Sequence, residues 1–158
     1  MEREPMSAVA GASRHRSGMS RDEIAALFAR RQDLYDNFDA AALAADYADD
    51  VVVESPIAGV HRGRAAAEEA LRAVFGAFLD MKTRTEALLI DGDRVAQVLA
   101  IEGTHIGEFI GVPPSHKPFR CAAVFLYELR DRKIVHERRI YDFTGFLVQI
   151  GVLKAKPA

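Results

Sequence analysis

Two side chains near the ends of apolar, strand-like segments have the types needed for acid–base chemistry. Asp142 ends the segment 133–142, and His105 lies near the end of the segment 94–106, beside a glycine-rich corner. A carboxylate held in an apolar pocket can exchange protons near neutral pH. An imidazole can donate to a carbonyl or polarise an enolate. The structural alternatives are that Asp142 caps a following helix and that His105 bonds to backbone in a bulge. The sequence leaves both open.

The last of these segments also sorts its polar side chains by parity. Because alternate residues of a strand share a face, His136, Arg138 and Asp142 would lie on one side. Arg139 and Tyr141 would lie on the other side. We expect His136 and Arg138 to line a ligand pocket if Asp142 does, unless a bulge shifts the strand. Tyr141 is a further pocket candidate, with a place in the core as its alternative.

The remaining candidates lie on the first predicted helix and in loops. Arg31 either extends to water or points into an interior cavity. Tyr35 either lines that pocket or places its hydroxyl in water. Phe109 either contacts a ligand or helps to fill the pocket. His61 and His116 fall in predicted loops, where we expect them to be exposed to solvent.

Helical periodicity covers most of the first half of the chain. Ser20 and Glu23 have the spacing of a capping box before an apolar stripe. The predicted elements are a helix from Ser20, a short helix from Asp39 to Asp49-Asp50 with Tyr47 on its inner face, a strand over 51–56, a loop over 57–63 and a helix over 64–79.

The second half changes to the period of two that is typical of strands. The predicted strands cover 82–90, 94–106, 119–130 and 133–142, with tight turns at Asp91-Gly92 and Asp131-Arg132. Residues 143–150 can form a terminal helical turn. This order predicts an α+β fold, in which a curved antiparallel sheet packs on three N-terminal helices as a cone-shaped, half-open barrel.

Composition narrows the class of protein further. With 158 residues and a net charge of −2, the chain is predicted to form one domain over 20–158 after a disordered leader, 1–19. No basic surplus or apolar segment points to nucleic acid or membrane. The single cysteine, Cys121, suits a cytoplasmic protein. The histidines lack ligand spacing, and cofactor-binding fingerprints are missing, so we predict no metal and no cofactor.

Three stretches resemble the SnoaL-like polyketide cyclases of the nuclear transport factor 2-like superfamily. The first is the helix-to-strand passage 39–56, which is typical of the superfamily. The second runs from Gly103 to Lys117 and contains a Gly-Thr-His strand end, a Phe-x-Gly corner and a double proline. The third is 137–142 with the tail 147–151. The chain departs from the family at His116, where glycine is common, and an unusual backbone angle is expected there.

The resemblance implies a cofactor-free intramolecular aldol cyclisation or isomerisation of a hydrophobic, oxygen-rich small molecule. It assigns the general acid/base role to Asp142, with His105 beside it. The alternative is a non-catalytic module of the same fold that binds a small molecule or dimerises, because one fold hosts many functions. A homodimer is expected under both, through an exposed sheet face that includes Val124, Leu126 and Ile134.

Overall fold

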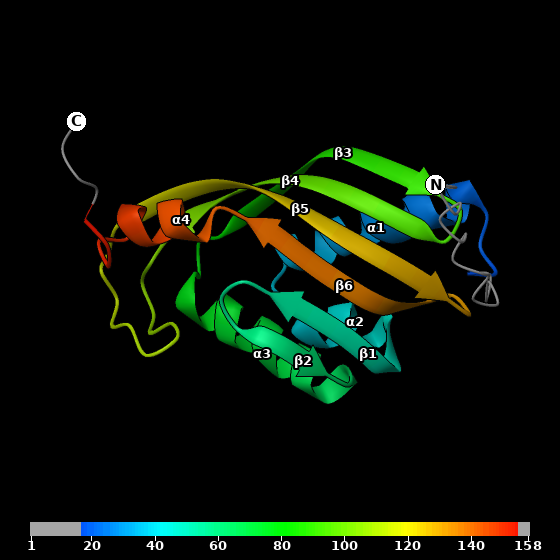
Figure 1. Ribbon diagram of the computed structural model, residues 1–158, viewed down its shortest axis with the longest axis horizontal. Coiled ribbons are helices and arrows are strands. Elements are labelled where there is room, and N and C mark those ends of the chain that lie inside the picture. Colours follow the sequence, from blue (N-terminus) through cyan, green and yellow to red (C-terminus); the bar gives the residue numbers. More distant parts are fainter. Residues whose placement is uncertain (1–16, 155–158) are drawn as a thin grey trace, which may run out of the picture.

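The computed structural model describes residues 17–154, which form an α+β fold (Figure 1). Its elements are, in chain order, α1 (Arg21–Asp36), α2 (Ala40–Ala45), β1 (Tyr47–Ser55), β2 (Gly59–Arg62), α3 (Arg64–Ala77), β3 (Lys82–Asp91), β4 (Arg94–Thr104), β5 (Pro118–Arg130), β6 (Lys133–Tyr141) and α4 (Phe143–Gln149). The predicted fold class is confirmed. Sequence analysis missed β2, because a strand of four residues that begins with Gly59 and is followed by Gly63 resembles a loop.

The strands form one curved sheet that does not close on itself. Their order is β2-β1-β6-β5-β4-β3. Strands β3 to β6 are the predicted meander, and β1 joins β6 in parallel, whereas the other neighbouring pairs are antiparallel. The first strand in the chain therefore pairs with the last.

Local sequence explains where the helices begin. Ser20 accepts a hydrogen bond from the backbone of Glu23, whose carboxylate accepts one from the Ser20 backbone, so the predicted capping box is present. Asp39 caps α2 through Ala42 N. The short helix ends earlier than predicted, and Tyr47 begins β1 instead of lying on the helix. The difference matters because it sends the Tyr47 side chain into the core.

Two tight hairpins set the register of the meander. The β3–β4 turn is Gly92-Asp93, one residue later than predicted, and Gly92 has the positive φ of +61° that this turn requires. The β5–β6 turn is Asp131-Arg132 as predicted. Both of its residues have positive φ, +50° and +63°, which is typical of a two-residue hairpin turn.

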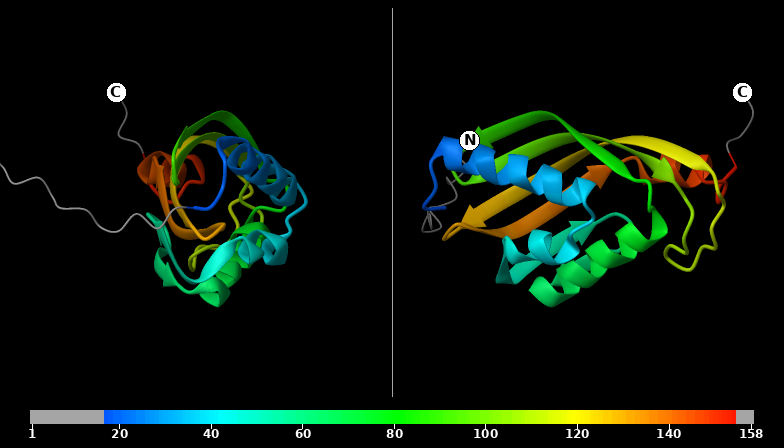
Figure 2. Two further views of the ribbon diagram at one scale, coloured as in Figure 1. Left: turned by 90° about the vertical axis from the view of Figure 1, so that its right-hand side faces the viewer. Right: turned by 180° about the vertical axis from the view of Figure 1, so that it is seen from behind.

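The helices α1, α2 and α3 cover the concave face of the sheet, as the end-on view shows (Figure 2). The buried core lies between these layers and is fully enclosed around Tyr47, Leu43 and Ile134. Ile134 is 0% exposed, so it cannot contribute to the outer sheet face where we expected it. A half-open cone of this shape can hold a small molecule inside.

The predicted leader lies mostly outside the described residues, at 1–16. Its last part is described: Ser17 is buried, and its carbonyl accepts a hydrogen bond from the backbone of Arg132. Across residues 17–154, none of the helices has the length and apolar character that crossing a membrane requires.

Candidate functional site

A cavity of about 460 Å³ opens between the sheet and the helices, and its wall includes Phe146 of α4. Most of its wall is apolar, including Val74, Leu99 and five phenylalanines. This volume and this apolar lining are typical of small-molecule sites. Polar or titratable side chains on the wall are Gln32, Tyr35, Ser55, His61, Glu69, Thr83, Glu108, Gln97, Cys121, Arg139 and Tyr141.

Several polar groups of the wall are satisfied by one another. Gln32 donates to Thr83 and accepts from Thr85, and Gln97 donates to the Thr85 hydroxyl at 2.8 Å. The hydroxyl of Tyr141 lies 3.2 Å from that of Ser55. These groups need no ligand to complete their hydrogen bonding.

Two other polar groups on the same wall are left without partners. The Tyr35 hydroxyl and Nε2 of His61 are buried and have no hydrogen-bond partner among the described residues. His61 lies in β2 opposite Val53 of β1, on the face that looks into the cone. Buried polar atoms are rarely left unpaired, so each of these two is free to bond to a water or a ligand in the cavity.

Arg139 brings a positive charge to the wall. Nε of its guanidinium donates to Oε1 of Glu137 at 2.6 Å, and its carbon lies 5.2 Å from the Phe125 ring centroid. This is the one hydrogen bond that the group makes within residues 17–154, and 12% of the side chain remains exposed. Its terminal nitrogens are therefore available to a ligand.

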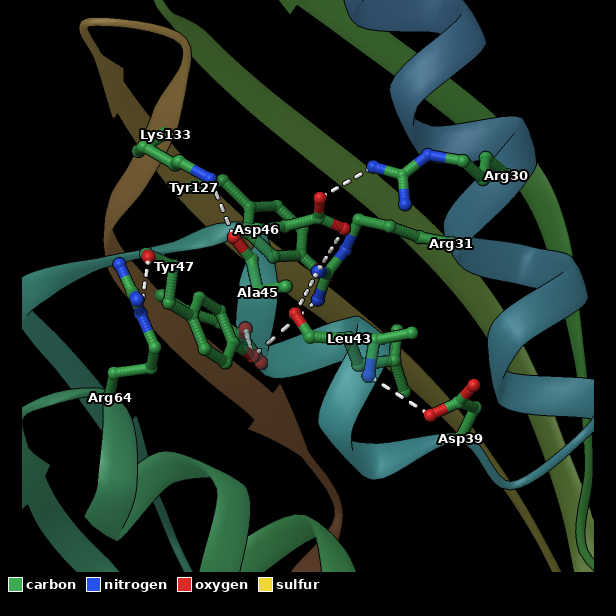
Figure 3. A network of polar contacts seen from close by, with 12 residues as sticks. Arg30, Arg31, Asp39, Leu43, Ala45, Asp46, Tyr47, Arg64, Tyr127 and Lys133 are labelled. Atoms are coloured by element: carbon green, nitrogen blue, oxygen red, sulfur yellow. Dashed lines mark hydrogen bonds and ion pairs between the residues drawn. The ribbon is translucent and has the colours of Figure 1, made fainter.

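A buried polar network adjoins the cavity (Figure 3). The Tyr47 hydroxyl donates to Oε2 of Glu137, and the other carboxylate oxygen of Glu137 accepts a hydrogen bond from Arg139. Arg31, 1% exposed, donates to Leu43 O and to Asp46 at 3.0 and 3.1 Å. The network thus fixes β6 to β1 and α1 and holds Arg139 in place.

The charges within this network determine its protonation. Burial would raise the pKa of Glu137, but Arg139 and Arg31 outweigh it and lower that pKa. Burial would lower the pKa of Arg139, but the Glu137 carboxylate raises it well above the usual value. Burial, assisted by Glu137, raises the pKa of Tyr35. At neutral pH, Glu137 is therefore ionised, Arg139 is charged and Tyr35 is a neutral donor.

Three of the residues predicted to bind a ligand line the cavity: Tyr35, Phe109 and Tyr141. Arg31 points inward, as one of its two alternatives required, but its guanidinium is enclosed in the network and does not line the cavity. The ring of Phe109 packs edge-on against Phe78 and leaves the cavity open, so these aromatics do not fill the cone.

The other face of β6 carries His136 and Arg138, which lie near Glu54 on the outside of the sheet. The expectation that they line the pocket is corrected, because the register of β6 turns Arg139 and Tyr141 inward instead. Asp142 is exposed and does not line the cavity. Its carboxylate caps α4 by accepting from Gly145 N at 2.8 Å.

His105 is fully buried behind the cavity wall. Its Nδ1 lies 3.1 Å from the Ser115 hydroxyl, and its Nε2 has no partner among the described residues. The backbone of His105 also pairs with that of His116 and Lys117, so it fixes the long loop. His116 has the expected unusual backbone angle, with φ of +58°. The structure does not bring His105 and Asp142 together in the cavity.

Sequence reasoning did not select His61 and Arg139 for the site. His61 was assigned to a loop because β2 was missed. Arg139 shared a face with Tyr141, yet the opposite face was favoured because of Asp142. Within the described residues, no cluster of three His, Cys, Asp or Glu side chains could hold a metal ion.

The half-open cone and its interior cavity have the nuclear transport factor 2-like fold that was expected from the resemblance. A model of the SnoaL-like polyketide cyclases matches residues 25–150, so the chain belongs to that family. The nogalonic acid methyl ester cyclase of Streptomyces nogalater is 33% identical over 95 residues, which are 59% of this chain and 70% of that protein.

Two solved structures are also similar. AclR from Streptomyces galilaeus, a proposed hydroxylase, is 25% identical with a TM-score of 0.75, covering 87% of each chain. IdmH from Streptomyces antibioticus, a proposed polyketide cyclase, is 27% identical with a TM-score of 0.68, covering 80% of this chain and 97% of IdmH. Because these neighbours differ in proposed activity, the fold alone does not decide the reaction.

Proposed function

We propose that this protein is a cofactor-free acid–base enzyme that closes a ring in a hydrophobic, oxygen-rich small molecule by an intramolecular aldol reaction. The observation that carries the proposal is the open apolar cavity with unpartnered polar atoms on its wall, Tyr35 Oη and His61 Nε2. Family membership supports the same class of reaction.

The chemistry requires one proton to be removed and one to be returned. A base takes a proton from a carbon flanked by carbonyls, and the resulting enolate carbon bonds to a second carbonyl carbon. The π electrons of that carbonyl move to its oxygen, which becomes an alkoxide. The alkoxide takes up a proton, and the resulting cyclic alcohol is an isomer of the substrate. A carbon between two carbonyls is acidic enough for a side-chain base without a metal or cofactor.

His61 is our candidate for that base, because its free ring nitrogen borders the cavity. Imidazole is the side chain most often used for proton transfer. The family resemblance favours Asp142 with His105 instead, and this remains the alternative assignment. In the structure Asp142 caps α4 and His105 lies behind the wall, so either would need to move to reach a ligand.

Nogalonic acid methyl ester is the first substrate to try, since the Streptomyces nogalater relative is named for it. Conversion to a cyclised product of equal mass would be followed by chromatography with mass spectrometry. We expect His61→Gln to lower kcat by roughly 10²–10⁴-fold, and His136→Gln, on the outer face, to leave it unchanged. Loss of turnover in Asp142→Asn but not in His61→Gln would transfer the role to Asp142. Tight binding of substrates of this type without turnover would favour the non-catalytic small-molecule module.

Localisation and assembly follow as smaller proposals. The single thiol and the balanced charge support a cytoplasmic protein. Exposed Leu89 and Leu126 on the sheet support a homodimer. A mass of one chain in sedimentation equilibrium would contradict the dimer.

A further inference from the structure

We propose that Tyr35 and Arg139 form an anion-binding site on the cavity wall, which takes the negatively charged oxygen of a flat, conjugated ligand. The site would receive either a carboxylate or an enolate, since both spread one charge over oxygens in a plane. Only its connection with catalysis rests on the proposed function; the binding itself does not.

The first support is the contrast among hydroxyl groups on one wall. Tyr141 is paired with Ser55 at 3.2 Å, whereas the Tyr35 hydroxyl has no partner among the described residues. Its raised pKa keeps the proton on the oxygen, so the hydroxyl would be stabilised by donating a hydrogen bond to an acceptor. An oxyanion is the strongest acceptor that could enter.

The second support is the orientation of Arg139. Its Nε is committed to Glu137 and its guanidinium carbon lies over the Phe125 ring. Burial of Glu137, 0% exposed, fixes the pair rigidly. The remaining N–H groups of a guanidinium lie in one plane and match a carboxylate or enolate oxygen. The partly exposed side chain places them against the cavity.

The third support is the local balance of charge. Three guanidinium groups, of Arg30, Arg31 and Arg139, face two carboxylates, of Asp46 and Glu137. The tyrosines of this network, Tyr35, Tyr47 and Tyr127, have raised pKa values and stay neutral. The network itself therefore holds one guanidinium group more than it has carboxylates, although the carboxylates of Glu69 and Glu108 also line the cavity. Solvent reduces the share of Arg30, which is 52% exposed in its side chain.

Binding of simple naphthalenes tests the site without any turnover. The probes are 2-naphthoate, its neutral methyl ester, and 2-naphthol titrated through its ionisation. We expect the protein to bind 2-naphthoate about tenfold more tightly than the ester, the size of one charge-assisted hydrogen bond. If the site prefers an enolate to a carboxylate, bound 2-naphthol will ionise at lower pH than free 2-naphthol. The affinity of 2-naphthoate will then exceed that of its ester by less than tenfold.

Three variants assign the effect to these residues. Tyr35→Phe removes an unpartnered hydroxyl and should cost the anions about tenfold in affinity while leaving the ester unchanged. Tyr141→Phe removes a partnered hydroxyl from the same wall and is the matched control. Glu137→Gln/Arg139→Met removes the ion pair without leaving a lone buried charge, so it should fold and lose the anion preference.

The outcomes separate this inference from the proposed function. Equal affinity for anion and ester in the unaltered protein, or an anion preference that survives in both Tyr35→Phe and the double variant, would overturn the site. Cyclisation without anion preference would contradict the site alone. Anion preference without cyclisation would retain the site and contradict the enzyme.

Discussion

The buried network around Glu137 and the cavity beside it hold similar groups and use them differently. In the network, Tyr47 donates to Glu137, and Arg31 is held by Asp46 and Leu43. On the cavity wall, Tyr35 has no partner, although it is buried close to the same charges. Paired polar groups stabilise the fold, whereas the unpaired hydroxyl on the cavity wall is free to bond to a ligand. Breaking each region separately tests this distinction.

The largest effect is expected from breaking the buried ion pair on one side. Glu137→Ala leaves the Arg139 charge buried without its partner, and we expect a loss of about 3–5 kcal/mol in the free energy of unfolding, measured with urea. Glu137→Gln/Arg139→Met removes both charges and should cost far less. Equal losses in the single and double variants would mean that the pairing is not what stabilises this region.

Acid breaks the same pair without a mutation. Because the folded state lowers the pKa of Glu137 below 4.5, its contribution is fully present above pH 4.5 and is lost as pH falls from there through the folded pKa. The stability of the unaltered protein should therefore fall more steeply below pH 4.5 than that of Glu137→Gln/Arg139→Met. Parallel pH profiles in urea unfolding would contradict the lowered pKa.

A matched pair of tyrosine variants compares the two regions directly. Tyr47→Phe removes a hydrogen bond to an ionised carboxylate and should cost about 1.5–3 kcal/mol. Tyr35→Phe removes a hydroxyl that lies beside Arg31 but makes no hydrogen bond of regular geometry within the described residues, and it should change stability by less than about 0.5 kcal/mol. Thermal and urea unfolding of both would show the difference. A loss in Tyr35→Phe as large as that in Tyr47→Phe would reveal a structural partner for Tyr35.

A smaller effect than that of Tyr47→Phe is expected outside both regions, at Asp142. Asp142→Ala removes the cap of α4 and should cost about 1 kcal/mol of stability. Asp142→Asn keeps a capping acceptor and should cost less, and neither change should alter the affinity of 2-naphthoate, measured by titration calorimetry. If Asp142→Asn lowers that affinity, the side chain reaches the cavity and the prediction from the family motif gains support.

Local sequence signals predicted the frame of the fold well. The helix caps and the tight turn involve residues that are close in the sequence, so they can be predicted without the rest of the chain. They are Ser20, Asp39 and Asp131-Arg132. The site depends on longer relationships. Arg138 and Arg139 are adjacent charged residues on opposite faces of β6, and parity alone cannot say which face is inside. The pairing of β1 with β6 decides it.

His61 shows a second limit. A four-residue strand has too few residues to display a period, and Gly59 and Gly63 at its sides favour a loop. Only its pairing with β1, opposite Val53, makes it a strand and turns His61 toward the cavity. Sequence reasoning named Tyr35, Phe109 and Tyr141 as pocket residues, and all three line the cavity. The family resemblance, however, directed attention to Asp142 and away from this histidine.

The parallel contact between β1 and β6 also bears on how the chain is made. Tyr47 and Glu137, which meet in the core, are 90 residues apart in the sequence. During synthesis the three N-terminal helices emerge from the ribosome long before β6. Arg31 and Tyr47 therefore have no Glu137 to interact with until β6 has been made. Contacts of such long range slow folding. The interior that could receive a ligand is therefore completed only after β6 has been made, and truncated chains that end before β6 would lack it.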